Sequence, residues 1–283
     1  MSTFSTINIL HLIQKYSLYS SIITFTFGVT GNLFNILIFT SLKLFRNNQF
    51  VLYLLIETIA NLFQLTIFFL IQLLIGIYEY DVAVFSLFWC KFRSVMIVVC
   101  TLVAFSSVCF SAIDQYLSTS HQFFLRQLST IKLAHILIST ATIISLLQTI
   151  PFAIFADIQA GACAVFNSHM ANYISYFYYP VLSGFLPILI ASTFSLLAYQ
   201  NVRRIVRRQI PLVRRRLDQQ LTAMVLIRII IFVIFTLPYT IQRMYTYITK
   251  INQTNMNLSA INSLIGFIAF AFFNLNYAVR YLK

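Results

Sequence analysis

Long uninterrupted stretches of apolar side chains alternate with short polar segments along the whole chain. No charged residue occurs between Lys15 and Lys43, and none occurs between Ser94 and Ile113. A helix of that length crosses about 30 Å of hydrocarbon at about 1.5 Å per residue. The pattern predicts seven spans, at residues 16–42, 50–77, 91–116, 132–155, 172–200, 219–248 and 256–282. We therefore expect an all-α membrane protein in which residues 1–283 form a single seven-helix bundle.

The third span is the one around which the others are expected to pack. It follows Cys90 at one end and closes on the polar tripeptide Asp114-Gln115-Tyr116 at the other. A helix that is tied by a cysteine at one end and finishes on an acid at the other can form the central helix of a membrane bundle.

Composition supports a membrane protein and argues against nucleic acid as a partner. Apolar residues make up 60% of the chain and charged residues only 9%, against about 25% charged residues in soluble domains. The net charge of +13 comes from basic residues clustered beside the apolar spans. This placement indicates membrane topology and attraction to lipid headgroups. The N-terminus lacks a basic leader segment, so we expect the first span, not a cleaved signal peptide, to direct insertion.

Charge also predicts the orientation of the bundle. One set of alternating loops carries Lys43, Arg126 and the basic segment 201–218, whereas the other carries the acids Asp81 and Asp157. The arginines of the basic segment are Arg203, Arg204, Arg207, Arg208, Arg214, Arg215 and Arg216. Because basic loops stay in the cytosol, the N-terminus is expected outside and the arginine segment inside.

The four cysteines allow one structural disulfide at most. Cys90 and Cys163 both fall in loops on the predicted outer side, where a disulfide can persist. Cys100 and Cys109 lie inside an apolar span. The chain is therefore no disulfide-stapled scaffold.

Several short motifs occur in a fixed order along the spans. They are Gly31-Asn32, Cys90 placed 24 residues before Asp114, Pro187, and Phe232 placed six residues before Pro238. Together they resemble the rhodopsin-like, class A, G-protein-coupled receptors over nearly the whole chain. The resemblance implies a disulfide between Cys90 and Cys163. It also implies a signalling role for Asp114, Gln115, Tyr116, Phe232, Pro238 and Asn276.

The chain departs from the family pattern at several of these positions. Gln115 replaces the arginine that reaches into the G-protein site, which keeps hydrogen bonding but loses the charge and the bidentate fork. Asn61 replaces the acid of the sodium site, so sodium is expected to bind poorly. Thr236 replaces a tryptophan, and Asn276 precedes Arg280 where the family carries a second asparagine.

Four polar residues within the spans are expected to face the bundle interior, because charge in hydrocarbon is costly. They are Asn32, Glu57, Asn61 and Arg228. We expect Glu57 of the second span to pair with Arg228 of the sixth. Two alternatives are that Arg228 extends to the cytosol and that Arg280 takes its place as the partner.

A ligand pocket is expected in the outer halves of the third, fifth, sixth and seventh spans. Family spacing assigns to it Ile97, Val98, Thr101, Tyr176, Tyr179, Ser183, Tyr239, Gln242 and Arg243. Ile97 stands where amine receptors carry an aspartate, which disfavours a biogenic amine. The aromatic rings and Arg243 suit a peptide or small molecule with an acidic or amidated end. Alternatively, the aromatic run at the start of the fifth span is an interfacial belt, and Arg243 is an interfacial anchor or a partner for Asp157. The run consists of Tyr173, Tyr176, Phe177, Tyr178 and Tyr179.

The resemblance implies a plasma-membrane receptor that binds an extracellular ligand, with a neuropeptide as one candidate. It would activate a heterotrimeric G protein through movement of the sixth helix. The arginine segment would contact the G protein or membrane lipids. A receptor-like protein that binds without signalling is the main alternative, and a transporter or channel is a further one. No enzyme activity, metal or cofactor is expected, and no lysine in the interior of a span could hold retinal.

Overall fold

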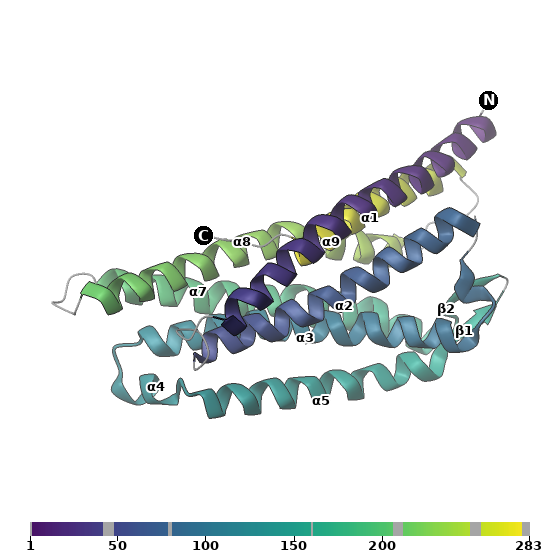
Figure 1. The fold of residues 1–283 in the computed structure, drawn as a ribbon. Coiled ribbons are helices and arrows are strands. Elements are labelled where there is room, and N and C mark those ends of the chain that lie inside the picture. Colours follow the sequence, from purple (N-terminus) through teal and green to yellow (C-terminus); the bar gives the residue numbers. More distant parts are fainter. Residues whose placement is uncertain are drawn as a thin grey trace.

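In the described part of the chain, seven long helices lie side by side in an elongated bundle, and each is long and apolar enough to span a membrane (Figure 1). Six are α1 (Ser2–Ser41), α2 (Gln49–Tyr78), α3 (Leu87–Thr119), α5 (Ile131–Phe155), α8 (Leu212–Thr249) and α9 (Met256–Ala278). The remaining one is built from three consecutive segments. Two short helices, η1 (Val82–Val84) and α4 (Phe123–Leu128), lie in the connections. The predicted fold class is confirmed.

The computed structural model describes residues 2–41, 48–78, 81–159, 161–205, 212–249 and 256–278. Within these ranges it describes every side chain except those at 2–12, 14, 82, 204–205, 212–221, 247–249, 256–257 and 259–260. Most of the predicted basic segment 201–218 therefore lies outside the described side chains, and Arg280 lies outside the described residues.

Helix α3 occupies the centre of the bundle. It packs against α2, α5, α7 and α8, and 61% of its most apolar stretch is buried, more than in any other described span. Its first turn is closed by Ser86, whose side chain accepts a hydrogen bond from the backbone N–H of Trp89. The sequence pattern predicted this central position.

The outer face of the bundle is apolar, as a surface in contact with lipid requires. Large side chains such as Phe27 and Leu189 are mostly exposed there. Threonine hydroxyl groups on this face form hydrogen bonds within their own helix. Thr30 and Thr140 each donate to the backbone carbonyl oxygen one turn earlier. In hydrocarbon every polar group needs an internal partner, and these back-bonds supply one without another helix.

A disulfide and a short hairpin close one end of the bundle, which we call the disulfide end. Strand β1 (Ala156–Gln159) pairs antiparallel with β2 (Ala162–Val165), and Cys163 in β2 is bonded to Cys90 in α3. The disulfide that the family resemblance implied is confirmed. We call the opposite end, which carries α4, the Asp114 end.

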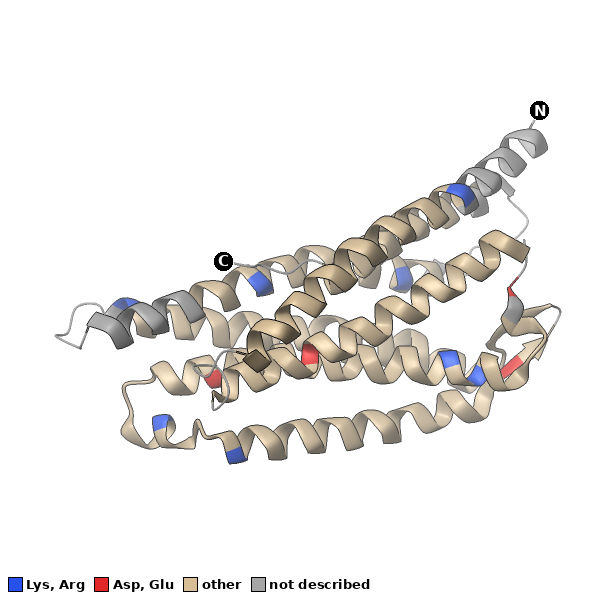
Figure 2. Cartoon of the chain, in the orientation of Figure 1, with Lys and Arg blue, Asp and Glu red and all other residues tan. Residues whose placement is uncertain are grey.

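Charged residues lie mostly toward the two ends of the helices, and few lie along their middle (Figure 2). At the disulfide end Arg93 forms a 2.7 Å ion pair with Asp81. Asp157 lies in the hairpin, where the backbone N–H of Ile158 and the side chain of Gln159 hold the pKa of its carboxyl below the usual value. Such a distribution follows from the cost of placing charge in hydrocarbon.

The fifth membrane helix changes its winding along its length. It starts as α6 (Ser168–Tyr173), continues as the wider π-helical segment η2 (Ile174–Phe185), which contains Pro180, and returns to α-helix as α7 (Leu186–Ile205). A π-helix bonds to the fifth residue along the chain instead of the fourth, so it turns the following side chains to different faces. The sequence predicted one span here but not this change in winding.

Gly184 allows η2 and α8 to approach closely. A Cβ atom there would lie 2.5 Å from Thr240 Cγ2 and 2.7 Å from the Tyr179 carbonyl oxygen. We expect Gly184→Ala to lower the free energy of unfolding by about 1–3 kcal/mol, because the crowded atoms must move. Thermal unfolding of the purified chain measures this change. Gly31→Ala is the matched control, since a Cβ at Gly31 meets only one atom, at 3.8 Å. Equal effects of the two substitutions would contradict the prediction.

Candidate functional site

A cavity of about 240 Å³ lies toward the disulfide end, between α3, η2, α8 and α9. We call it the disulfide-end cavity. Its lining consists of Phe68, Ile97, Val98, Thr101, Phe152, Tyr178, Tyr179, Ser183, Tyr239, Arg243, Phe270 and Phe273. The walls are mainly aromatic, with a few hydroxyl groups and one guanidinium. Such a mainly apolar cavity with a few convergent polar groups is typical of a small-molecule site.

Seven of the nine predicted pocket residues lie in this lining. They are Ile97, Val98, Thr101, Tyr179, Ser183, Tyr239 and Arg243. Their ligand-binding role stays a prediction, but the structure brings them together around one space.

Tyr176 and Gln242 do not line this cavity, and their ligand-binding role stays a prediction without support from its lining. Tyr176 is 62% exposed, because the π-helical winding of η2 turns Tyr178 inward instead. Gln242 contacts α9: its Nε2 donates to Thr246 Oγ1 at 2.9 Å and lies 3.5 Å from Asn262 Oδ1. Family spacing assumes a regular α-helix, which does not hold in η2. It also gives no information on the hydrogen bonds that Gln242 makes with neighbouring side chains.

The sequence missed five lining residues, Phe68, Phe152, Tyr178, Phe270 and Phe273. Tyr178 belongs to the aromatic run at the start of the fifth span, but regular helical spacing selects Tyr176 and Tyr179 from that run. The phenylalanines carry no distinguishing signal, because the chain has 29 of them and many face lipid.

Arg243 is held in the cavity wall by two tyrosine rings. Its Nε–H donates to the Tyr239 hydroxyl at 3.0 Å, and its Cζ lies 5.1 Å from the Tyr239 ring centroid and 5.4 Å from that of Tyr179. A cation near the face of an aromatic ring is attracted by the ring quadrupole. The structure thus places Arg243 in the wall of the cavity, whereas Asp157 makes its hydrogen bonds within the hairpin.

Aromatic rings close the floor of the cavity. Phe232 is fully buried and packs edge-on against Phe105, with ring centroids 4.8 Å apart. Tyr239 stacks on Phe273 at 4.5 Å. The hydroxyl of Tyr277 shares a 3.2 Å hydrogen bond with Thr101. This cluster joins α3, α8 and α9 beneath the cavity.

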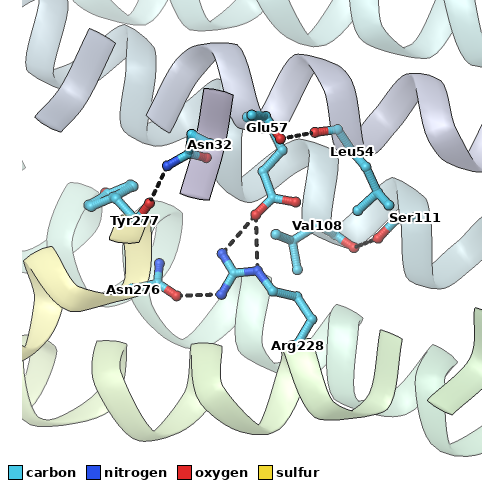
Figure 3. Close-up of polar contacts among 9 residues, drawn as sticks. Asn32, Leu54, Glu57, Val108, Ser111, Arg228, Asn276 and Tyr277 are labelled. Atoms are coloured by element: carbon cyan, nitrogen blue, oxygen red, sulfur yellow. Dashed lines mark hydrogen bonds and ion pairs between the residues drawn. The ribbon is translucent and has the colours of Figure 1, made fainter. Parts of the chain in front are cut away.

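An intramembrane ion pair lies deeper in the bundle (Figure 3). Arg228 Nη2 and Nε lie 2.7 Å and 3.0 Å from Glu57 Oε1, and Arg228 Nη1 donates to Asn276 Oδ1 at 2.7 Å. The Glu57 side chain is 1% exposed and that of Arg228 12%. The structure therefore brings together the two charges that the sequence suggested as partners, and it ties α2, α8 and α9 at one point.

The other intramembrane polar residues are also buried. Asn32 Nδ2 donates to the Tyr277 carbonyl oxygen at 3.0 Å, which joins α1 to α9 (Figure 3). Asn61 and Gln64 are both fully buried on the inner face of α2. The polar side of α2 therefore points into the bundle, as the cost of polar groups in hydrocarbon predicts.

At the Asp114 end, Gln115 joins α3 to α8. Its Nε2 donates to Thr222 Oγ1 at 2.7 Å, and both side chains are buried. The neighbouring Asp114 accepts a 2.8 Å hydrogen bond from the Ser129 hydroxyl. Tyr116 packs its ring against Phe194, with centroids 5.5 Å apart. A neutral hydrogen bond thus links α3 and α8 at the position where the family pattern has a charged arginine.

The basic segment is described at only one of its arginine side chains. Arg203 is exposed and lies over the Tyr199 ring, with Cζ 5.2 Å from the centroid. The side chains of the other arginines lie outside the described part of the structure: Arg204, Arg207, Arg208, Arg214, Arg215 and Arg216.

Seven apolar helices, a disulfide that ties the third helix to the following connection, and a cavity at that same end define a seven-helix membrane receptor. Residues 31–276 match the family model described as 7 transmembrane receptor (rhodopsin family). The chain belongs to this family, and it is accordingly a multi-pass protein of the plasma membrane.

The chain is also similar to a curated relative, the somatostatin receptor type 4 of Rattus norvegicus. The two are 28% identical over 178 residues, which cover 59% of this chain and 46% of the relative. The match thus spans about half the length of that relative. Both comparisons point to a receptor and not to an enzyme.

Proposed function

We propose that this chain binds an extracellular ligand in the disulfide-end cavity and activates a heterotrimeric G protein through movement of α8, its sixth membrane helix. The observation that carries the proposal is the course of α8 itself. The helix contributes Tyr239 and Arg243 to the cavity wall, Arg228 to the central ion pair, and Thr222 to the contact with Gln115. Because one continuous helix carries all of these residues, a shift of α8 would connect the cavity to the Asp114 end.

The same proposal assigns an orientation. The disulfide end would face the extracellular side, and the Asp114 end, with its arginine-rich segment, would face the cytosol. The arginines would contact the G protein or anionic lipid headgroups, because each basic residue near a negatively charged leaflet is attracted to it.

The lining of the cavity supports a peptide or a small non-amine molecule as the ligand. The printed name of the rat relative makes that protein a somatostatin receptor. For this chain the absence of an acid among the described cavity residues argues against an amine. A neuropeptide remains our proposal for the class of peptide.

Gln115 favours a second candidate function, a receptor-like protein that binds ligand without signalling. Glutamine offers no charge and no bidentate fork to a G protein. A transporter is disfavoured, because residues 31–276 match a receptor family.

G-protein recruitment in cells separates the two candidates, with wild type and Gln115→Arg compared at matched surface expression. We expect both chains to recruit, with the stronger signal from Gln115→Arg. If only Gln115→Arg recruits G protein, the native chain is a receptor whose signalling is blocked by Gln115. Recruitment by neither, with and without candidate ligands, would contradict the proposed signalling function.

The contact between Gln115 and Thr222 gives a second test of the α8 movement. We expect Thr222→Val to raise basal recruitment by roughly 2- to 10-fold, because it removes one buried hydrogen bond, worth about 0.5–1.5 kcal/mol, that holds α8 to α3. Thr222→Ser is the matched control, since it keeps the hydroxyl group. A Val variant that recruits no more than the Ser variant would argue against this contact as a restraint.

A further inference from the structure

Arg243 is the one charged residue among the described residues that line the disulfide-end cavity. A guanidinium stays protonated at all physiological pH values. Around it lie aromatic rings and the side chains of Ile97 and Val98, which provide little screening. The acids described near this end lie elsewhere: Asp81 pairs with Arg93, and Asp157 is in the hairpin. Among its described lining residues the cavity therefore has one cation and no carboxylate.

The guanidinium is also held in a fixed orientation before any ligand arrives. Two aromatic rings contact it, and the Nε–H bond to Tyr239 fixes the plane of the fork. Tyr239 is in turn stacked on Phe273. An arginine fork is complementary to the two oxygens of a carboxylate, and a preorganised fork loses less conformational entropy when it binds.

The volume of the cavity limits the size of the group that can be attached to the anionic end of a ligand. Its volume of about 240 Å³ lies below the range of about 300–1,000 Å³ for sites of drug-sized ligands. It has room for one acidic end group with an attached apolar or aromatic body. Rings from α2, α5 and α9 provide the surface for that body, at Phe68, Phe152 and Phe270.

We propose that the disulfide-end cavity recognises the carboxylate end of a ligand with an aromatic or aliphatic body, and that Arg243 binds the carboxylate. The inference rests on the proposed function only in treating this cavity as the ligand site. The sequence is compatible with a ligand that has either an acidic or an amidated end, and this proposal selects the acidic one. A free small acid and the C-terminus of a peptide share this chemistry.

The test compares matched probes on the purified chain in lipid nanodiscs by ligand-observed NMR titration. The small-acid probes are 3-phenylpropanoate, 3-phenylpropanamide and 3-phenylpropylamine. The peptide probes are N-acetyl-Leu-Phe with a free carboxylate and the same dipeptide as its amide. We expect each acid to bind about 10- to 100-fold more tightly than its amide, because charged hydrogen bonds are the stronger ones. The amine should bind most weakly. Whichever acid binds more tightly identifies the source of the carboxylate.

The variants locate the effect at Arg243. Arg243→Gln should abolish the preference for acid over amide while the affinity for the amides stays within about threefold, which shows that the cavity is still formed. Arg243→Lys should keep part of the preference, because lysine retains the charge but not the fork. Arg93→Gln is the matched control: it removes an arginine at the same end that pairs with Asp81 outside the cavity lining, and the preference should persist.

Several results would overturn the proposal: equal binding of acid and amide, a preference for the amine, binding of none of the probes, or an acid preference that survives in Arg243→Gln. This readout involves no G protein. Loss of recruitment with acid binding intact would therefore contradict the signalling function alone, and recruitment without acid binding would contradict this proposal alone.

Discussion

Glu57→Gln is expected to lower the stability of the folded chain by about 3–5 kcal/mol, because it leaves the charge of Arg228 buried without its carboxylate. The Arg228 side chain is only 12% exposed, so little water can take the place of the carboxylate. The remaining contact, with Asn276, offers a dipole instead of a full charge. The thermal midpoint of the purified chain should fall by roughly 10 °C, and the fraction that reaches the cell surface should fall with it.

A double variant distinguishes the loss of the pair from the loss of either side chain. Glu57→Leu combined with Arg228→Leu should recover most of the stability, because it removes both buried charges together. The single variant Arg228→Leu should be nearly as unstable as Glu57→Gln, since it leaves the carboxylate of Glu57 buried without the guanidinium. If the double variant is as unstable as the sum of the two single variants, the pair does not act as a unit.

Removal of the disulfide is expected to have the next largest effect. Cys163→Ser should lower the free energy of unfolding by about 2–5 kcal/mol, because the bond with Cys90 closes a loop with a sequence separation of 73 residues. The bond also anchors the hairpin beside α3, since Cys90, Ala83 and Ala156 pack together there. Thermal unfolding and surface expression measure the change.

Reduction provides the control for the disulfide. Cys90→Ser combined with Cys163→Ser should be no less stable than either single variant, since all three lack the same bond. Dithiothreitol should destabilise wild type by a similar amount and leave the double variant unchanged, although Cys100 and Cys109 remain as free thiols. A double variant that is still sensitive to dithiothreitol would show that the reagent acts elsewhere than on the Cys90–Cys163 bond, and would contradict this assignment.

The sequence predicted the cavity-lining residues of α3 and α8, and on the fifth membrane helix it predicted Tyr179 and Ser183 but missed Tyr178. Regular helical spacing places residues correctly where the helix is regular, as at Ile97 and Tyr239. In η2 the winding widens, so Tyr178 lies in the wall where Tyr176 was expected. The residue types of this segment do not predict the change to π-helical winding, because Pro180 is compatible with a kink as well as with a π-helix.

The phenylalanines of the cavity show a second limit. A phenylalanine in a membrane helix is equally suited to lipid and to the bundle interior, so its type does not reveal its direction. Phe27 faces outward and Phe273 is buried, although both lie in spans of similar apolar character. Polar residues behave differently, since lipid excludes them, and Asn32 and Glu57 could be assigned to the interior from the sequence alone.

The sequence by itself determined the seven spans, the inward direction of the polar residues and the receptor family. These properties follow from hydropathy and motif spacing along the chain, because the bilayer imposes length and polarity on each helix separately. Only the tertiary structure decided which side chains meet. The bond of Gln115 to Thr222 and the two rings around Arg243 depend on how helices rotate and wind against one another. Packing contacts between several helices set those rotations, and no single segment of the chain contains them.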